Sequence, residues 1–146
     1  GSQAFRTFIR KELMPAIRAR YRTTDETAIV GESLAGLFVV ETFLKEPDLF
    51  NTYIAFDPSL WWNKEGIITA ASADLKSGLA QRRTLYMGTS SDGNAGGYMT
   101  KFAAIVAADA GPLVTSKHVN YAAELHSTVY HPAALAAFRE LFKPSK

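Results

Sequence analysis

TAIVGESLAGLFVV, residues 27–40, contains the most informative transition in the chain. An apolar run ends at Gly31, a serine follows at Ser33, and a helix-like apolar pattern begins directly afterwards. The small residues Gly31 and Ala35 stand two positions before and two positions after the serine, where a sharp turn would bring backbones close together. The stretch is therefore predicted to form a buried strand, a tight turn that carries Ser33, and a helix.

Strands and helices are predicted to alternate along the rest of the chain. Strands are expected at 26–31, 51–59, 83–90 and 118–125, and helices at 4–21, 34–45, 66–80, 98–110 and 132–142. Pro15 is expected to kink the first helix, and Pro132 is expected in the first turn of the last one. This alternation predicts an α/β fold, with a parallel sheet of about four strands and helices on both faces. The 146 residues suit a single domain, 1–146.

Composition and charge narrow the classes of function. The formal net charge is +2, from 16 basic and 14 acidic residues, which is too balanced to favour nucleic acid as a partner. The absence of cysteine excludes disulfide and thiolate chemistry. His118, His126 and His131 lack the short spacing to carboxylates that metal sites show, so neither a metal nor another cofactor is expected. No apolar segment is long enough to span a bilayer, and no membrane partner is expected.

Ser33 is a candidate nucleophile because of where it stands. A serine hydroxyl is a weak nucleophile until a neighbouring base takes its proton. The amide of Leu34 would lie at a helix N-terminus, where its N–H can point at a developing oxyanion. The alternative is purely structural, since serine is also a favoured N-cap of helices.

His126 is the predicted base. It follows the last expected strand, and triads of the order serine, acid, histidine place the histidine in that loop. His131 precedes Pro132 and is expected to be a cap or a surface residue. His118 is expected at the start of the last strand, at the opposite end of the sheet from the carboxyl ends where active residues cluster.

The acid of the triad is less clearly indicated. Asp92 is the predicted acid, because it is the only carboxylate in the loop after the third expected strand. Asp-Gly is also a strong turn signal, so a structural role explains Asp92 equally well. Asp57, at the end of the second expected strand, is the rival position, and a Ser-His dyad without an acid is the third alternative.

Two adjacent aromatic residues follow the second expected strand in DPSLWWN, 57–63. Trp61 and Trp62 are placed on the same side of the sheet as Ser33, and they are predicted to bind substrate by lining an acyl or aromatic pocket. Packing in the core is an equally good explanation for both.

Four stretches together resemble a known family: FIRKELMPAIRARY (8–21), AIVGESLAGLFVVETFLKEPDLFNTYIAFDPSLWW (28–62), TLYMGTSS (84–91) and LHSTVYHPAAL (125–135). They resemble the putative esterase family of α/β-hydrolases, which includes siderophore esterases, S-formylglutathione hydrolases, feruloyl esterases and mycolyltransferases. The Pro-Ser-Leu-Trp-Trp motif resembles the siderophore-esterase branch. The resemblance implies a small-molecule ester substrate, with Ser33 as nucleophile and His126 as base. Glu32 stands where the family often has histidine, and the position of the acid is not matched.

The resemblance also implies that this chain corresponds to the C-terminal portion of such an esterase. The family's helix that resembles FIRKELMPAI follows several N-terminal strands, whereas here it opens the chain. The absent part would supply strands beside 28–30 and the second oxyanion donor, whose loss typically costs roughly 100- to 1,000-fold in rate. The strand at 28–30 would become an exposed edge, through which a homodimer or an association with the missing half is expected.

The sequence thus predicts a serine hydrolase that cleaves carboxylic esters through an acyl-enzyme. An acyltransferase would use the same residues and differ only in the acceptor. The alternative from another class is a truncated, catalytically silent α/β module with a structural or partner-binding role.

Overall fold

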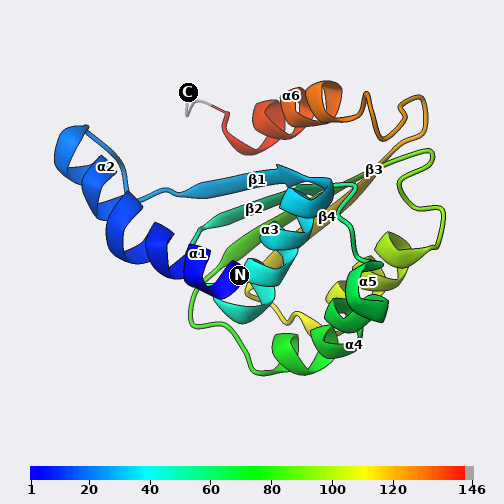
Figure 1. The fold of residues 1–146 in the computed structure, drawn as a ribbon, viewed down its shortest axis with the longest axis horizontal. Coiled ribbons are helices and arrows are strands. Elements are labelled where there is room, and N and C mark those ends of the chain that lie inside the picture. The colour runs from blue at the N-terminus through cyan, green and yellow to red at the C-terminus, as the bar shows by residue number, and fades with distance from the viewer. Residues whose placement is uncertain (144–146) are drawn as a thin grey trace.

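The computed structural model describes residues 1–143 and confirms the α/β fold. Its four strands form one parallel sheet, in which each strand pairs with the next along the chain. The strands are β1 (Ala28–Glu32), β2 (Thr52–Phe56), β3 (Arg83–Ser90) and β4 (Val114–Tyr121). Because the strands are parallel, all their carboxyl ends lie at the same end of the sheet (Figure 1).

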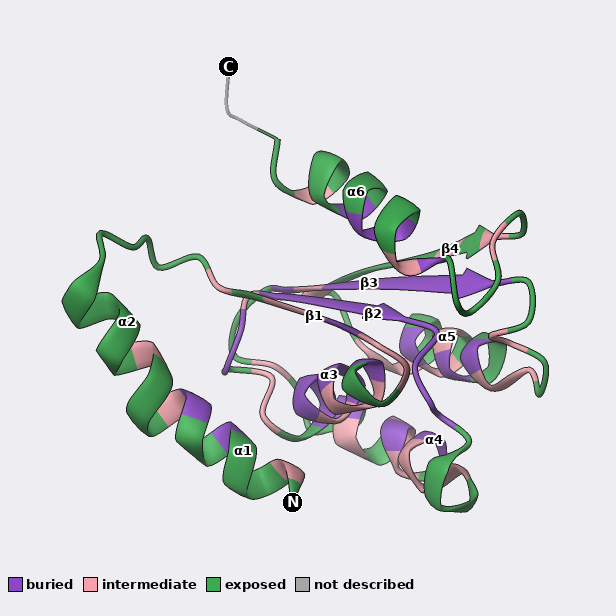
Figure 2. Ribbon diagram, turned by 45° about the horizontal axis from the view of Figure 1, so that its top comes forward, coloured by how far each residue is buried: buried purple, intermediate pink, exposed green. Residues whose placement is uncertain are grey.

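Helices cover both faces of the sheet, as predicted (Figure 2). They are α1 (Ser2–Phe8), the π-helical segment η1 (Ile9–Leu13), α2 (Met14–Arg20), α3 (Ser33–Lys45), α4 (Trp62–Lys76), α5 (Tyr98–Asp109) and α6 (Tyr130–Leu141). Among the helices within residues 1–143, only α6 lies on the second face (Figure 2). Every residue of β2 is buried, because Tyr53 and Ala55 enter the larger apolar cluster while Ile54 and Phe56 enter the cluster beneath α6.

The first helix runs unbroken from Ser2 to Arg20 through a π-helical segment. The sequence predicts a kink at Pro15. The structure instead has a π-helical segment, Ile9–Leu13, shortly before Pro15. Proline cannot donate a main-chain hydrogen bond and its ring crowds the preceding turn. A local π-helical turn absorbs this irregularity without ending the helix.

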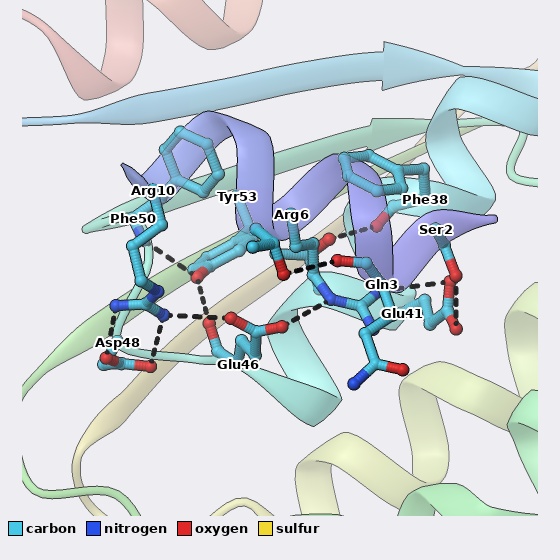
Figure 3. A network of polar contacts seen from close by, with 12 residues as sticks. Ser2, Gln3, Arg6, Arg10, Phe38, Glu41, Glu46, Asp48, Phe50 and Tyr53 are labelled. Carbon is cyan, nitrogen blue, oxygen red and sulfur yellow. Dashed lines mark hydrogen bonds and ion pairs between the residues drawn. The ribbon is translucent and has the colours of Figure 1, made fainter. Parts of the chain in front are cut away.

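Charged side chains hold the first helix against the end of α3 (Figure 3). The buried Arg6 guanidinium lies 2.8 Å from Glu46 and 3.3 Å from Glu41. One turn further on, Arg10 contacts Asp48 at 2.8 Å, and this pairing lowers the pKa of Asp48. The helix is thus anchored by ion pairs. Much of its apolar stripe stays exposed, namely Phe5, Phe8, Leu13 and Ile17.

The last strand lies four residues earlier than predicted, at Val114–Tyr121 instead of 118–125. It is an edge strand whose residues 115–118 are polar and exposed, so they show no apolar alternation in the sequence. The correction moves His118 from the start of the strand to its middle, opposite Met87.

The fourth helix begins at Trp62, four residues before the predicted start. Its first turn is left-handed, because Asn63, Lys64 and Glu65 have φ values of 51°, 52° and 60°. The right-handed part of α4 begins near Gly66, where the sequence predicts the start of the helix. None of the helices within residues 1–143 is long and apolar enough to cross a bilayer.

Candidate active site

Ser33 lies at the turn between β1 and α3, with a left-handed backbone (φ 56°). A Cβ on Gly31 would stand 2.5 Å from the main chain of Ala35, so strand and helix approach too closely there for any side chain. The N-cap residue of α3 is Glu32 and no side chain caps the helix. The alternative that Ser33 serves as a helix N-cap is therefore wrong.

One cavity of about 300 Å³ brings most of the candidate residues together at the carboxyl ends of the strands. Its lining includes Ser33, Asp57, Trp61, Asp92 and His126. Four separate segments contribute these side chains, those that follow β1, β2, β3 and β4. Residues up to 93 positions apart in the sequence thus meet at one site, as a parallel sheet allows.

The ring of His126 is paired with the carboxylate of Asp57. Its Nδ1 lies 3.1 Å from Asp57 Oδ2, and the Asp57 side chain is fully buried whereas that of His126 is 45% exposed. The main-chain N–H of Ser90 donates to Asp57 Oδ1 at 2.8 Å, and the Ser90 hydroxyl donates to Oδ2. A carboxylate at Nδ1 favours the tautomer that carries its proton there, which leaves Nε2 free to accept one.

Asp92 contacts the same histidine in a different way. Its Oδ1 accepts the main-chain N–H of His126 at 2.7 Å and lies 2.9 Å from the Ser90 hydroxyl. These two hydrogen bonds, that from His126 first, lower the pKa of Asp92 below its usual value. The structure therefore differs from the predicted pairing, since Asp92 lies in the loop against the His126 main chain while the rival, Asp57, faces the ring.

The Ser33 hydroxyl lies 3.4 Å from the hydroxyl of the buried Ser59. The main-chain N–H of Ser59 also donates to the Ser33 carbonyl at 3.0 Å, which fixes the two segments together. Within residues 1–143 no hydrogen bond joins Ser33 to His126 in this conformation. Catalytic hydrogen bonds are often long before substrate binds, and a hydroxyl can rotate toward its base.

Leu34 follows Ser33 in the first turn of α3. Main-chain N–H groups at the start of a helix have no acceptor within the helix, so they are available to an anion. The side chain of Leu34 is 58% exposed and lines a neighbouring groove of about 480 Å³.

The two tryptophans are not part of the core, which rules out that explanation of them. Each is 54% exposed, and their ring centroids lie 5.9 Å apart at an interplanar angle of 60°. Trp61 lines the cavity that holds Ser33, whereas Trp62 lines the groove beside Leu34.

The other two histidines lie outside this cavity. His118 contacts the Thr89 hydroxyl through Nε2, and burial lowers the pKa of its ring. His131 is exposed in the first turn of α6. Among the described residues, no group of three or more histidine, aspartate or glutamate side chains is arranged to hold a metal ion.

Known proteins with similar sequences are esterases. The chain is 44% identical over 69 residues to the ferri-bacillibactin esterase BesA of Bacillus subtilis, a match that covers 47% of this chain and 24% of that protein. It is 34% identical over 74 residues to a siderophore enterobactin esterase of Emericella nidulans, covering 49% of this chain and 24% of the other.

Solved structures extend the likeness to nearly the whole chain. An IroE-like serine hydrolase from Shewanella oneidensis matches 98% of this chain and 48% of its own, with a TM-score of 0.88 and 28% identity. The siderophore hydrolase EstA from Aspergillus nidulans, at 21% identity, shares the fold with a TM-score of 0.86 over 97% of this chain and 57% of its own. The chain thus spans about half the length of these structures.

The family model with the description "Putative esterase" matches residues 1–130. This match covers most of the chain and agrees with the parallel sheet and with the esterases found among its relatives. The chain belongs to the Putative esterase family of α/β-hydrolases.

Proposed function

We propose that this chain carries the catalytic triad of a serine esterase, with Ser33 as nucleophile, His126 as base and Asp57 as acid. The observation that supports this assignment is the pairing of the His126 ring with the buried Asp57 in the cavity that Ser33 also lines. The positive φ of Ser33 and the close approach at Gly31 are typical of a nucleophile elbow.

In the proposed reaction, His126 Nε2 takes the proton of the Ser33 hydroxyl as Oγ attacks the ester carbonyl carbon. The carbonyl oxygen becomes an oxyanion that accepts the N–H of Leu34. Asp57 accepts the Nδ1–H and stabilises the imidazolium that forms. When the intermediate collapses, His126 gives the proton to the departing alkoxide of the ester. The alcohol dissociates, and Ser33 is then acylated.

The second half of the proposed reaction uses the same groups with water. His126 takes a proton from water, the hydroxide attacks the acyl carbon, and collapse releases the carboxylic acid and regenerates the Ser33 hydroxyl. Leu34 supplies the oxyanion donor in this proposal, and losing one such donor typically costs roughly 100- to 1,000-fold in rate.

The substrate class we propose is a siderophore ester, by analogy with the relatives named as siderophore esterases. Trp61 and Trp62 support this proposal, because two half-exposed indoles beside the cavity offer flat apolar surfaces to an aromatic or acyl group. Trp61 would contact the group nearest Ser33, and Trp62 a group that extends over Leu34.

Hydrolysis of enterobactin and of p-nitrophenyl butyrate tests this function. We expect Ser33→Ala and His126→Gln each to lose at least about 1,000-fold in kcat/KM on both esters. His131→Gln, an exposed histidine outside the cavity, is the matched control and should keep the parent rate. Parent-level hydrolysis by folded Ser33→Ala would rule out the proposed nucleophile.

A second candidate function, partner binding, is favoured by the contrast between the two sheet edges. The β4 edge carries Lys117, His118 and Asn120, which are polar residues of the kind that discourage strand pairing. The β1 edge carries Ala28, Ile29 and Val30, and its one charged residue, Glu32, stands at the end of the strand.

Apolar grooves flank β1 on both faces of the sheet. On one face, a groove of about 450 Å³ is lined by Leu13 and Ile17 of the first helix. On the other face, Phe138 and Phe142 at the end of α6 line a groove of about 260 Å³. A strand added beside β1 would therefore find apolar surface on both of its own faces.

The occupant we propose is a β-strand of another polypeptide that runs parallel to β1. The first helix lies on the face that α3 covers and leads into β1 (Figure 2). Crossovers between parallel strands are right-handed, so a strand that precedes this helix would lie beyond β1, on the side away from β2. This chain covers 48% and 57% of the two matched structures, so both contain further residues.

A further inference from the structure

Residues at the end of β3 hold the loop that carries His126. Ser91 donates from its main-chain N–H (2.9 Å) and from its hydroxyl (2.8 Å) to the carbonyl oxygen of Glu124. Asp92 Oδ1 accepts the His126 N–H at 2.7 Å. These three hydrogen bonds, here called the Ser91–Asp92 clamp, fix the main chain on both sides of Leu125.

Ser90 connects this clamp to the buried acid. Its hydroxyl lies between two carboxylates, those of Asp57 and Asp92, and accepts the N–H of Gly93 at 3.0 Å. A Cβ on Gly93 would stand 2.0 Å from Asp57 Oδ1, so only glycine allows the turn to close over that carboxylate. One turn therefore contacts Asp57 and the main chain of His126.

We propose that Asp92 is a positioning residue, which acts through the main chain of His126 to keep the ring against Asp57. This inference rests on the proposed function, in which His126 is the base. The ring is 45% exposed and lies in a turn, so the contact with Asp57 depends on where the main chain is held. Release of the clamp would let the ring leave Asp57, and small misplacements of catalytic groups cost up to about 100-fold.

Three variants separate a positioning role from that of the acid. Asp92→Asn keeps the Oδ1 acceptor and removes the charge, so we expect it to lose no more than about threefold in kcat. Asp92→Ala removes the acceptor and should lose about 10- to 100-fold in kcat, with KM changed less than about twofold. Asp57→Asn should lose about 10,000-fold, as expected for the acid of a triad.

The exposed Asp25, in the loop before β1, offers a matched control, and Asp25→Ala should keep the parent kcat and KM. If Asp92→Asn falls as far as Asp92→Ala, the charge rather than the acceptor matters and the positioning role is overturned. Because these two variants leave the buried Asp57 untouched, the comparison stands even if Asp57→Asn fails to fold.

Amide hydrogen exchange provides a readout that does not depend on turnover. The His126 amide should exchange at least about 10-fold faster in Asp92→Ala than in the parent chain and in Asp92→Asn, because only Asp92→Ala lacks the acceptor. Equal exchange in all three would overturn the inference whatever the activity. If the exchange rates follow this pattern but hydrolysis does not depend on Ser33, the clamp is supported and only the proposed function is contradicted.

Discussion

Ser33 has a left-handed backbone, and the segments around it pack closely. Gly31 stands where a Cβ would meet the main chain of Ala35 at 2.5 Å. Gly36 faces Phe56 and Pro58, where a Cβ would have 3.1 Å contacts. The small residues around the serine in the sequence thus mark a real close approach between β1, α3 and the segment after β2.

Gly31→Ala tests this close approach. We expect the free energy of unfolding to fall by about 1–3 kcal/mol, because the added methyl meets main-chain atoms that cannot rotate away. Gly66→Ala is the matched control, since its new Cβ would meet only the Asn63 side chain, at 3.2 Å, and it should cost little or stabilise the helix. Urea unfolding of both variants gives the comparison, and equal stabilities would contradict the packing described here.

The sequence could predict Ser33 and His126 as residues of the site, but it could not decide between Asp57 and Asp92 as the acid. Ser33 and His126 follow strands, and parallel strands bring such positions to one edge, so their arrival in one cavity follows from the topology. Asp57 and Asp92 both meet this condition. Their difference lies in the fold of the loops, which turns Asp57 toward the ring and Asp92 toward the main chain of His126.

At the scale of elements, β1, β2 and β3 could be predicted because each contains an apolar run bounded by turn residues. β2 is buried throughout and β3 nearly so, whereas β1 is only partly buried. The sequence predicts β4 four residues too late, because an edge strand with an exposed face has no apolar run that marks its position. The first helix was placed correctly, but its apolar side chains are not all buried, because Phe5 and Ile17 remain 51% and 42% exposed.

We expect His118 to make the stability of the chain depend on pH. Although His118 is exposed on the edge strand, partial burial of its ring lowers the pKa of the ring from the usual 6.5, so the unfolded chain takes up this proton at a higher pH than the folded chain does. The contribution of His118 to stability is complete above pH 6.5 and is lost as the pH falls from there toward the lower folded pKa. Urea midpoints at pH 7.5 and 5.5 should therefore drop more for the parent chain than for His118→Gln. An equal drop would show that His118 contributes nothing to the pH dependence.

At the scale of the whole molecule, the exposed apolar surface is concentrated around β1. The first helix is tied to α3 by ion pairs through Arg6 and Arg10 (Figure 3), while its apolar stripe borders the groove beside β1. The end of α6 leaves Phe138 and Phe142 exposed on the opposite face. An exposed apolar surface that continues into an unpaired strand edge is expected to bind another polypeptide.

We therefore expect the isolated chain to associate with itself through β1. Sedimentation velocity over a range of concentrations should show a mass that rises above the monomer mass of 16.0 kDa. Ala28→Lys, a charge on the exposed edge, should shift the chain toward monomer, because a lysine discourages strand pairing. Ala19→Lys, on the exposed end of α2, is the matched control. A parent chain that stays monomeric at high concentration would contradict self-association through β1.

Labelling with a fluorophosphonate probe, read by intact mass, asks whether Ser33 is activated in this chain. We predict one adduct on the parent chain and on Ser77→Ala, a serine at the end of α4, and no adduct on Ser33→Ala. An adduct that persists in Ser33→Ala, or a folded parent chain that takes none, would contradict the assignment of Ser33 as the nucleophile of an assembled triad.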